Sequence, residues 1–146
     1  MRLKSILPLT LLVTIVSFQS QAQEEDTVLI EKTVLNYIEN FFEKKFEAMN
    51  ESLHPRLAKR GLNPDRTMSG DFPPAALKTL MESNQFFPVS AQKNKVTNIK
   101  VFRDVATATL VTGYPRTRWV EFMHLVKVED KWKIINVFWE FFEKKP

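Results

Sequence analysis

The sequence WVEFMHLVKVEDKWKI, residues 119–134, contains two side chains of types that perform acid and base chemistry, the carboxylate of Glu121 and the imidazole of His124. A carboxylate and an imidazole in contact can move a proton between substrate atoms. The alternation of β-branched, aromatic and polar residues around them predicts a strand, whose successive side chains point to opposite faces. Because one position is odd and the other even, these two side chains cannot meet as a catalytic pair.

Glu129 and Asp130 separate this strand from the next and predict a two-residue hairpin turn, which fixes the register. The expected pairs are Val128 with Lys131, Lys127 with Trp132, Leu125 with Ile134, Met123 with Asn136, and Glu121 with Phe138. We expect the Trp132 face to lie under helices, with Glu121 and Asn136 where the core opens. The other face carries His124, Phe122, Val137 and Trp139, and its apolar surface also favours a cover, such as a partner subunit.

The N-terminal part is predicted to be helical over residues 26–53, where apolar residues recur at spacings of three and four. Asp26 suits the N-cap, and the charged residues 43–45 suit a break between two helices. The proline that follows His54 disfavours a helical backbone there, so the helix should end at His54. A short turn over residues 56–61 should follow.

Residues 62–72 favour a loop, and Asp71 can cap a helix that begins at Pro73 or Pro74. From Val96 onward the period changes to that of strands. The expected strands are residues 96–102, 105–112, 118–128 and 131–138. Helices followed by a meandering antiparallel sheet predict an α+β domain with the helices packed on one face.

Residues 1–22 have the pattern of a secretory signal peptide: Arg2 and Lys4, an apolar run over residues 6–18, and Ser20-Gln21-Ala22 as a cleavage site. The run is shorter than the ~20 residues that span a bilayer, so we expect no stable membrane anchor. The expected mature protein is residues 23–146, one domain, periplasmic or secreted.

The charge distribution argues against nucleic acid as a partner. Loss of Arg2 and Lys4 removes two positive charges and lowers the net charge from +4 to +2. The remaining basic residues alternate with acidic ones, whereas a nucleic-acid surface gathers them on one face. The sequence has no cysteine and only two histidines, so a metal site would need mostly carboxylates, and these show no ligand spacing. We therefore expect neither a metal site nor a cofactor.

The chain resembles the lumazine-binding family within the nuclear transport factor 2-like, or SnoaL-like, superfamily. The resemblance rests on Tyr37, on Leu53-His54-Pro55, on Glu121-Phe122 and on the hairpin from Lys127 to Asn136. The acidic position is often aspartate and the turn often Asp-Gly in relatives. The resemblance implies a cone, in which a strongly curved antiparallel sheet wraps the helices and encloses a pocket at its wide end, and a homodimer through the outer sheet face.

The candidate ligand-binding residues are Glu121, Asn136, Met123, His54, Tyr37 and Phe41. Glu121 is also the candidate catalytic residue, since an unpaired buried carboxylate is costly and needs a partner or a ligand. Its alternative role is structural, bonded to a helix or to Arg118. The aromatic clusters at 41–42, 86–87 and 138–142 suit a core and a dimer interface, with stacking on a flat heterocycle as the alternative.

Three functions remain open at this point. The first is binding of a small apolar or aromatic molecule, with Glu121 orienting it. The second is an isomerase or dehydratase with Glu121 as general base, which would also require a donor for the developing oxyanion. The third is a protein-interaction module whose pocket is filled by its own side chains. A fold alone does not choose between them.

Overall fold

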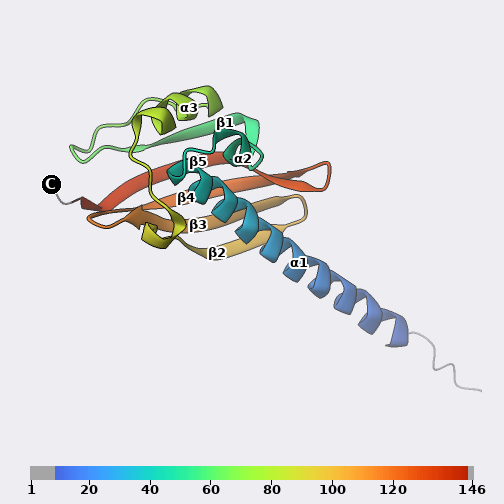
Figure 1. Ribbon diagram of the computed structural model, residues 1–146. Coiled ribbons are helices and arrows are strands. Elements are labelled where there is room, and N and C mark those ends of the chain that lie inside the picture. The colour runs from blue at the N-terminus through green and yellow to red at the C-terminus, as the bar shows by residue number, and fades with distance from the viewer. Residues whose placement is uncertain (1–8, 145–146) are drawn as a thin grey trace, which may run out of the picture.

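The computed structural model describes the backbone of residues 9–144 and the side chains of residues 21–142. Figure 1 shows helices over one face of a curved sheet. The elements are α1 (Leu9–Phe42), α2 (Phe46–Asn50), β1 (Leu53–Leu62), α3 (Pro74–Ser83), a 3-10 helix η1 (Val89–Ala91), β2 (Lys95–Phe102), β3 (Val105–Tyr114), β4 (Thr117–Val128) and β5 (Lys131–Lys144). The five strands lie in the order β1-β5-β4-β3-β2. Only β1 runs parallel to its neighbour, so the α+β prediction is confirmed with a mostly antiparallel sheet.

The core lies between α1 and the concave face of the sheet (Figure 1). From α1 it takes one stripe at helical spacing, Ile30, Val34, Tyr37, Ile38 and Phe41, all buried. From the sheet it takes Leu110, Met123, Leu125, Trp132 and Ile134. The face that carries Trp132 is therefore the one under the helices, as predicted.

Residues 53–62 correct the sequence prediction, because they form strand β1 instead of a helix end and a turn. Ala58 pairs with Asn136 and Leu62 with Glu140, so the hydrogen bonds of β1 come from a strand far along the chain. The register shifts between Leu53 and Ala58, the stretch that contains Pro55. An edge strand tolerates a proline at such an irregularity because no second neighbour needs its missing N–H.

Two predicted helix caps are also wrong. Asp26 lies inside α1, which begins at Leu9, and its Oδ1 accepts hydrogen bonds from Lys127 Nζ at 2.8 Å and Trp132 Nε1 at 2.9 Å. Asp71 pairs with Arg60 at 3.0 Å, and Pro73 occupies the N-cap of α3 without a side-chain cap. The predicted break at 43–45 is confirmed between α1 and α2.

The predicted signal peptide falls partly outside the described part of the chain. Residues 1–8 are not described, and residues 9–20 are described only as helical backbone. Helix α1 continues through the predicted boundary between residues 22 and 23. Within the described residues, no helix combines the length and the apolarity that crossing a bilayer requires.

The β4–β5 hairpin has the predicted register near its turn and a different one farther out. Leu125 pairs with Ile134 as expected, but the register then shifts, and His124 pairs with Asn136. One extra residue on β5 forms a bulge, which reverses the facing of the side chains from Asn136 to Phe141, and a second register shift lies between Arg118 and Trp119. Glu121 consequently lies opposite Trp139 rather than Phe138.

The turn of this hairpin gives a stability prediction. Glu129 and Asp130 both have positive φ, 49° and 60°, as a type I′ turn requires. Because a side chain in the left-handed region costs roughly 1 kcal/mol, Asp130→Gly should raise the free energy of unfolding by about 0.5–1 kcal/mol in urea denaturation. Asp104→Gly, in the β2–β3 turn at a residue without positive φ, should lower it. An equal gain from both glycines would contradict this explanation.

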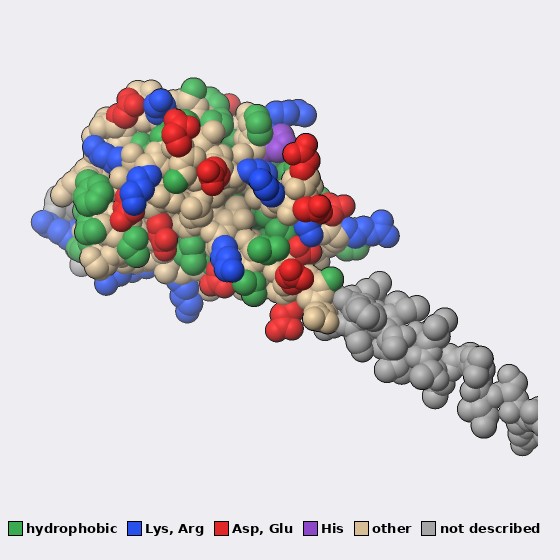
Figure 2. Space-filling model, turned by 45° about the vertical axis from the view of Figure 1, so that its right-hand side comes forward, with side chains coloured by type: hydrophobic (Ala, Val, Ile, Leu, Met, Phe, Trp, Pro, Cys, Tyr) green, Lys and Arg blue, Asp and Glu red, His purple; other side chains and the backbone are tan. Residues whose placement is uncertain are grey.

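Figure 2 shows one face of the molecule, where acidic and basic side chains lie interspersed rather than gathered by sign. The outer face of the sheet differs, since it exposes large apolar side chains, Phe102, Val105 and Phe122 among them. Phe122 pairs with Thr109 on one side and with Phe138 on the other, so these residues form a row across three strands.

Candidate functional site

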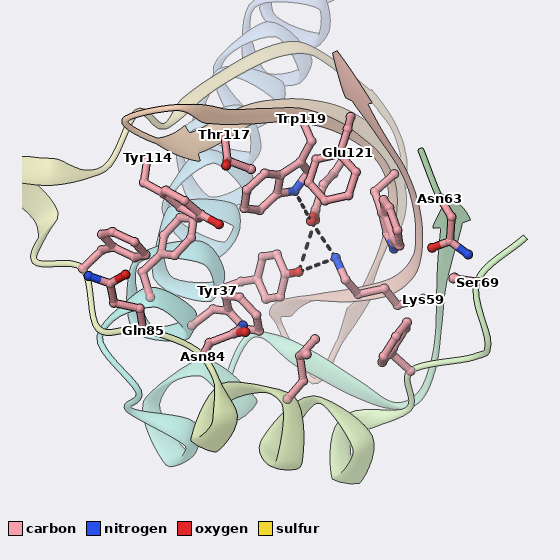
Figure 3. A pocket seen from close by; sticks show the side chains of 17 residues that line it. Tyr37, Lys59, Asn63, Ser69, Asn84, Gln85, Tyr114, Thr117, Trp119 and Glu121 are labelled. Atoms are coloured by element: carbon pink, nitrogen blue, oxygen red, sulfur yellow. Dashed lines mark hydrogen bonds and ion pairs between the residues drawn. The ribbon is translucent and has the colours of Figure 1, made fainter. Parts of the chain in front are cut away.

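A cavity of about 340 Å³ opens at the end of the core away from the β4–β5 turn. It lies between α1, α3, the segment after α3, and the distal parts of β1, β4 and β5 (Figure 3). Most of its wall is aromatic. The lining side chains are Tyr37, Phe41, Phe42, Lys59, Asn63, Ser69, Phe72, Leu80, Asn84, Gln85, Phe87, Tyr114, Thr117, Trp119, Glu121, Trp139 and Phe141.

Four polar side chains from three parts of the chain meet in this cavity (Figure 3). Lys59 Nζ lies 2.6 Å from Glu121 Oε1 and donates to the Tyr37 hydroxyl at 2.8 Å. The Tyr37 hydroxyl donates to Glu121 Oε2 at 3.2 Å, and Trp119 Nε1 donates to Glu121 Oε1 at 3.0 Å. Both carboxylate oxygens of Glu121 are therefore engaged.

The ion pair is buried, with Glu121 1% and Lys59 6% exposed. Glu121 faces inward from β4 by the same alternation that buries Thr117, Met123 and Leu125. Lys59 faces inward from β1, between Leu57 and Gly61. Burial lowers the pKa of the Lys59 ammonium, while the charge and hydrogen bond of Glu121 act to raise it. Each charge compensates the desolvation of the other.

Burial raises the pKa of the Tyr37 hydroxyl well above its usual 10.0, and the negative charge and hydrogen bond of Glu121 raise it further. Tyr37 therefore stays protonated in the folded protein at a pH where it ionises in the unfolded chain. Its contribution to stability is complete below pH 10.0 and is lost as the pH rises through the folded-state pKa.

An alkaline titration tests this coupling. We expect the tyrosinate absorbance of Tyr37 to appear above pH 10.0 and only together with unfolding, as followed by circular dichroism. Tyr37→Phe should remove the absorbance that coincides with unfolding, and Tyr114→Phe should keep it. Ionisation of Tyr37 in a fully folded protein would contradict the buried network.

The aromatic wall is built by edge-to-face contacts. Phe42 at the end of α1 contacts Trp119 and Tyr114 at centroid distances of 5.7 and 6.0 Å. Phe87 stacks on Tyr114 at 4.1 Å with an interplanar angle of 11°. Such contacts hold the rings in fixed orientations and give the cavity an apolar wall.

Three of the six predicted ligand-binding residues lie at the cavity, and three do not. Tyr37, Phe41 and Glu121 line it. Met123 is buried in the core below it. His54 lies near the start of β1, where its Nδ1 accepts from the Arg56 backbone N–H at 3.1 Å. Asn136 faces outward and lies 3.1 Å from His124, because the bulge in β5 turns it away from Glu121.

The sequence reasoning missed Lys59 and Trp119. Lys59 was assigned to a turn, although an alternation of Leu57, Lys59 and Gly61 on one side of a strand would have placed it with Glu121. Trp119 is two residues before Glu121 and thus on the same face, which the strand period alone could have shown. The structural alternative for Glu121 was a bond to a helix or to Arg118. Tyr37 of α1 does donate to Glu121 Oε2, whereas Arg118 Nε donates to the Thr112 carbonyl at 3.2 Å.

The chemistry available here is that of hydrogen bonds and charge in an apolar surround. Tyr37, Lys59 and Trp119 are donors, and Glu121 is the acceptor they share. Within the described residues no three histidine or acidic side chains gather as a metal site would require.

Known proteins share the sequence pattern and the fold of this chain. The model of a family described as "Putative lumazine-binding" matches residues 25–140. No curated protein matches the chain. A nuclear transport factor 2-like protein of unknown function from Shewanella baltica has a TM-score of 0.71 at 20% identity, covering 80% of this chain and 94% of that one.

Two further solved structures share the fold. One, from Silicibacter pomeroyi, is also a nuclear transport factor 2-like protein of unknown function, with a TM-score of 0.73 at 13% identity, covering 81% of this chain and 97% of that one. A ketosteroid isomerase-like protein from Erwinia carotovora has a TM-score of 0.62 at 14% identity, covering 82% and 96%. The chain belongs to the family described as "Putative lumazine-binding", and its fold is nuclear transport factor 2-like.

Proposed function

We propose that this protein binds a small, flat, apolar or aromatic molecule in the cavity, with the Lys59–Glu121 pair as its polar contact. The observation that carries the proposal is the closed network of Tyr37, Lys59, Glu121 and Trp119 inside an aromatic wall. Concave, mostly apolar sites with a few convergent polar groups are typical of ligand-binding sites. The open cavity argues against a module whose pocket is filled by its own side chains.

The second candidate is an isomerase or dehydratase with Glu121 as general base. The observation that favours it is the Tyr37 hydroxyl, 3.2 Å from Glu121 Oε2, because a base needs a nearby donor for the oxyanion it creates. A likeness to a ketosteroid isomerase-like protein points the same way. Against it, three donors already engage the carboxylate, which leaves about one acceptor position, on Oε2, for a substrate proton.

Calorimetric titration with lumazine, the planar ligand that the family description names, tests the first candidate. We expect saturable binding that Phe87→Ala weakens about tenfold, since Phe87 lines the cavity and stacks on Tyr114. Phe86→Ala is the matched control, because Phe86 is 52% exposed and is not part of the cavity wall. Equal loss from both variants would argue that lumazine binds elsewhere.

Proton exchange in D₂O tests the second candidate. A general base in the cavity should catalyse exchange of the α-hydrogens of 2-tetralone, an aromatic ketone, and NMR would follow the loss of their signal. Glu121→Gln should abolish this exchange if Glu121 is the base. If the α-hydrogens exchange no faster than in buffer alone while 2-tetralone still binds, Glu121 is not a general base, and the binding function remains.

We further propose export and a homodimer. Export is supported by the signal-peptide pattern of residues 1–22, and the dimer by the apolar outer face around Phe122, which is 55% exposed. Native mass spectrometry of the full chain expressed in a bacterium, with the periplasmic and cytoplasmic fractions measured separately, tests both, and the expected species is a periplasmic dimer that begins at Gln23. A monomer would exclude the sheet interface, and an uncleaved cytoplasmic chain would exclude export.

A further inference from the structure

The buried donor and charge of Lys59 define the chemical class of the ligand. We propose that the cavity takes an uncharged planar molecule that carries a carbonyl oxygen, and that Lys59 Nζ donates a hydrogen bond to this oxygen. This inference rests on the proposed binding function and specifies its ligand.

Lys59 has one more hydrogen-bond donor than the described residues use. An ammonium group has three N–H donors. Two of them are directed at Glu121 Oε1, 2.6 Å away, and at the Tyr37 hydroxyl, 2.8 Å away. Among residues 21–142 no other acceptor is hydrogen-bonded to Nζ, although the residue is 6% exposed and lines the cavity. A buried donor of this kind needs an acceptor, and a carbonyl oxygen of a ligand in the cavity would supply one.

The other three polar side chains of the network already use most of their hydrogen-bonding positions within the protein. Both oxygens of Glu121 accept bonds from the protein, and the Tyr37 hydroxyl and Trp119 Nε1 both donate to them. Three donors thus fill three of the roughly four acceptor positions of the carboxylate, while one N–H of the Lys59 ammonium has no acceptor among residues 21–142. An unsatisfied donor on a buried charged group costs more than an unused lone pair, so the site favours a ligand with an acceptor oxygen.

The net charge of the cavity lining also bears on the ligand. Of the described residues that line it, Lys59 and Glu121 carry the charges, and they neutralise each other. A ligand oxygen on the third N–H of Lys59 would lie roughly 4–5 Å from Glu121 Oε1, given the tetrahedral ammonium. A carboxylate there would meet a like charge in a poorly solvated site, and an uncharged carbonyl would not.

The far side of the cavity is consistent with a neutral ligand. The side chains of Asn84 and Gln85 line it across from Lys59 (Figure 3). An amide offers both donors and an acceptor and adds no charge. Phe87, Tyr114 and Trp119 also line the cavity and provide apolar, aromatic surface for a planar ligand.

Three probes of one shape and different chemistry test the proposal by calorimetry: 2-acetylnaphthalene, 2-naphthoate and 2-ethylnaphthalene. The ketone should bind about tenfold more tightly than the hydrocarbon, as a hydrogen bond from a charged donor allows, and the carboxylate should bind more weakly than the ketone. The carbonyl stretch of the bound ketone should move to lower frequency in the infrared, as hydrogen bonding requires.

Variants assign the effect to Lys59. The double variant Lys59→Met/Glu121→Gln removes both charges together, so no buried charge is left unpaired, and it should bind the ketone and the hydrocarbon equally. Lys78→Met, at an exposed lysine of α3, should keep the preference for the ketone.

The outcomes separate the two proposals. If 2-naphthoate binds most tightly, or if the ketone and the hydrocarbon bind equally to the unmodified protein, the ligand class is wrong while the binding function stands. If none of the three probes binds and lumazine does not bind either, the binding function itself is wrong and the ligand class falls with it.

Discussion

Lys59→Met is expected to lower the free energy of unfolding by about 3–5 kcal/mol, because it leaves a buried carboxylate without its counter-charge. Glu121 is 1% exposed, and Lys59 Nζ, 2.6 Å away, is its ionic partner. The remaining donors, the Tyr37 hydroxyl and Trp119 Nε1, are neutral. Glu121→Gln should be destabilising for the converse reason, since the ammonium of Lys59 would remain buried and uncompensated.

The double variant Lys59→Met/Glu121→Gln decides whether this cost comes from the unpaired charge. Removing both charges together is often close to neutral, because the desolvation of the two ions is removed along with their attraction. The amide oxygen introduced by Glu121→Gln would still accept the hydrogen bond of Trp119, and its NH₂ would donate to the Tyr37 hydroxyl. We therefore expect the double variant to be more stable than either single variant.

Urea denaturation of the unmodified protein, the two single variants and the double variant gives the coupling energy between Lys59 and Glu121 directly. Lys45→Met is the matched control, because Lys45 also forms an ion pair, with Glu43 at 2.7 Å, but its side chain is 61% exposed. An exposed pair contributes at most about 1 kcal/mol, so this variant should change stability little. If the losses from Lys59→Met and Glu121→Gln simply add in the double variant, the two residues do not stabilise each other as a pair.

The inward position of Glu121 could be predicted from sequence because it depends on local rules. The strand period places every odd position of β4 on one face, and a two-residue turn fixes which face of β5 lies opposite near the hairpin end. The structure confirms both statements, since Glu121, Met123 and Leu125 are buried and Leu125 pairs with Ile134.

Lys59 could not be found in this way, because its position depends on a long-range contact. A short segment with Pro55 near its start has weak local preference for a strand, and the pairing partner of β1 lies in β5, near the other end of the chain. Parallel pairing leaves no hairpin signal in the sequence. The local rules for helix ends were applied correctly to residues 53–61 and gave the wrong element, because tertiary contacts decided it.

The bulge in β5 had a similar effect on a single residue. Counting from the turn places Asn136 on the inner face, and the extra residue near position 135 moves it to the outer face beside His124. The same shift brings Trp139 inward to form part of the cavity wall. Nothing in the composition of residues 131–138 marks the bulge, since a β-branched residue occupies that position as it would in a regular strand.

Gly61→Ala should lower the free energy of unfolding by about 3 kcal/mol, because β1 passes too close to β5 for a side chain at this position. Gly61 pairs with Trp139 in the parallel register. A Cβ at Gly61 would overlap the carbonyl oxygen of Trp139 and its ring atom Cδ2, and would lie 2.6 Å from ring atom Cε2. The backbone oxygen cannot rotate away as the end of a flexible side chain could, so β1 and β5 would have to separate.

Separation at this point would also reach the site, because Trp139 lines the cavity and Lys59 lies two residues before Gly61 on the same strand. We therefore expect Gly61→Ala to weaken lumazine binding as well as stability, measured by calorimetry and by urea denaturation. Gly70→Ala is the matched control, because a Cβ there has no atom within 4 Å, and both properties should be unchanged. If Gly61→Ala retained wild-type stability, β1 would not be held against Trp139, and the inward placement of Lys59 would lose its structural basis.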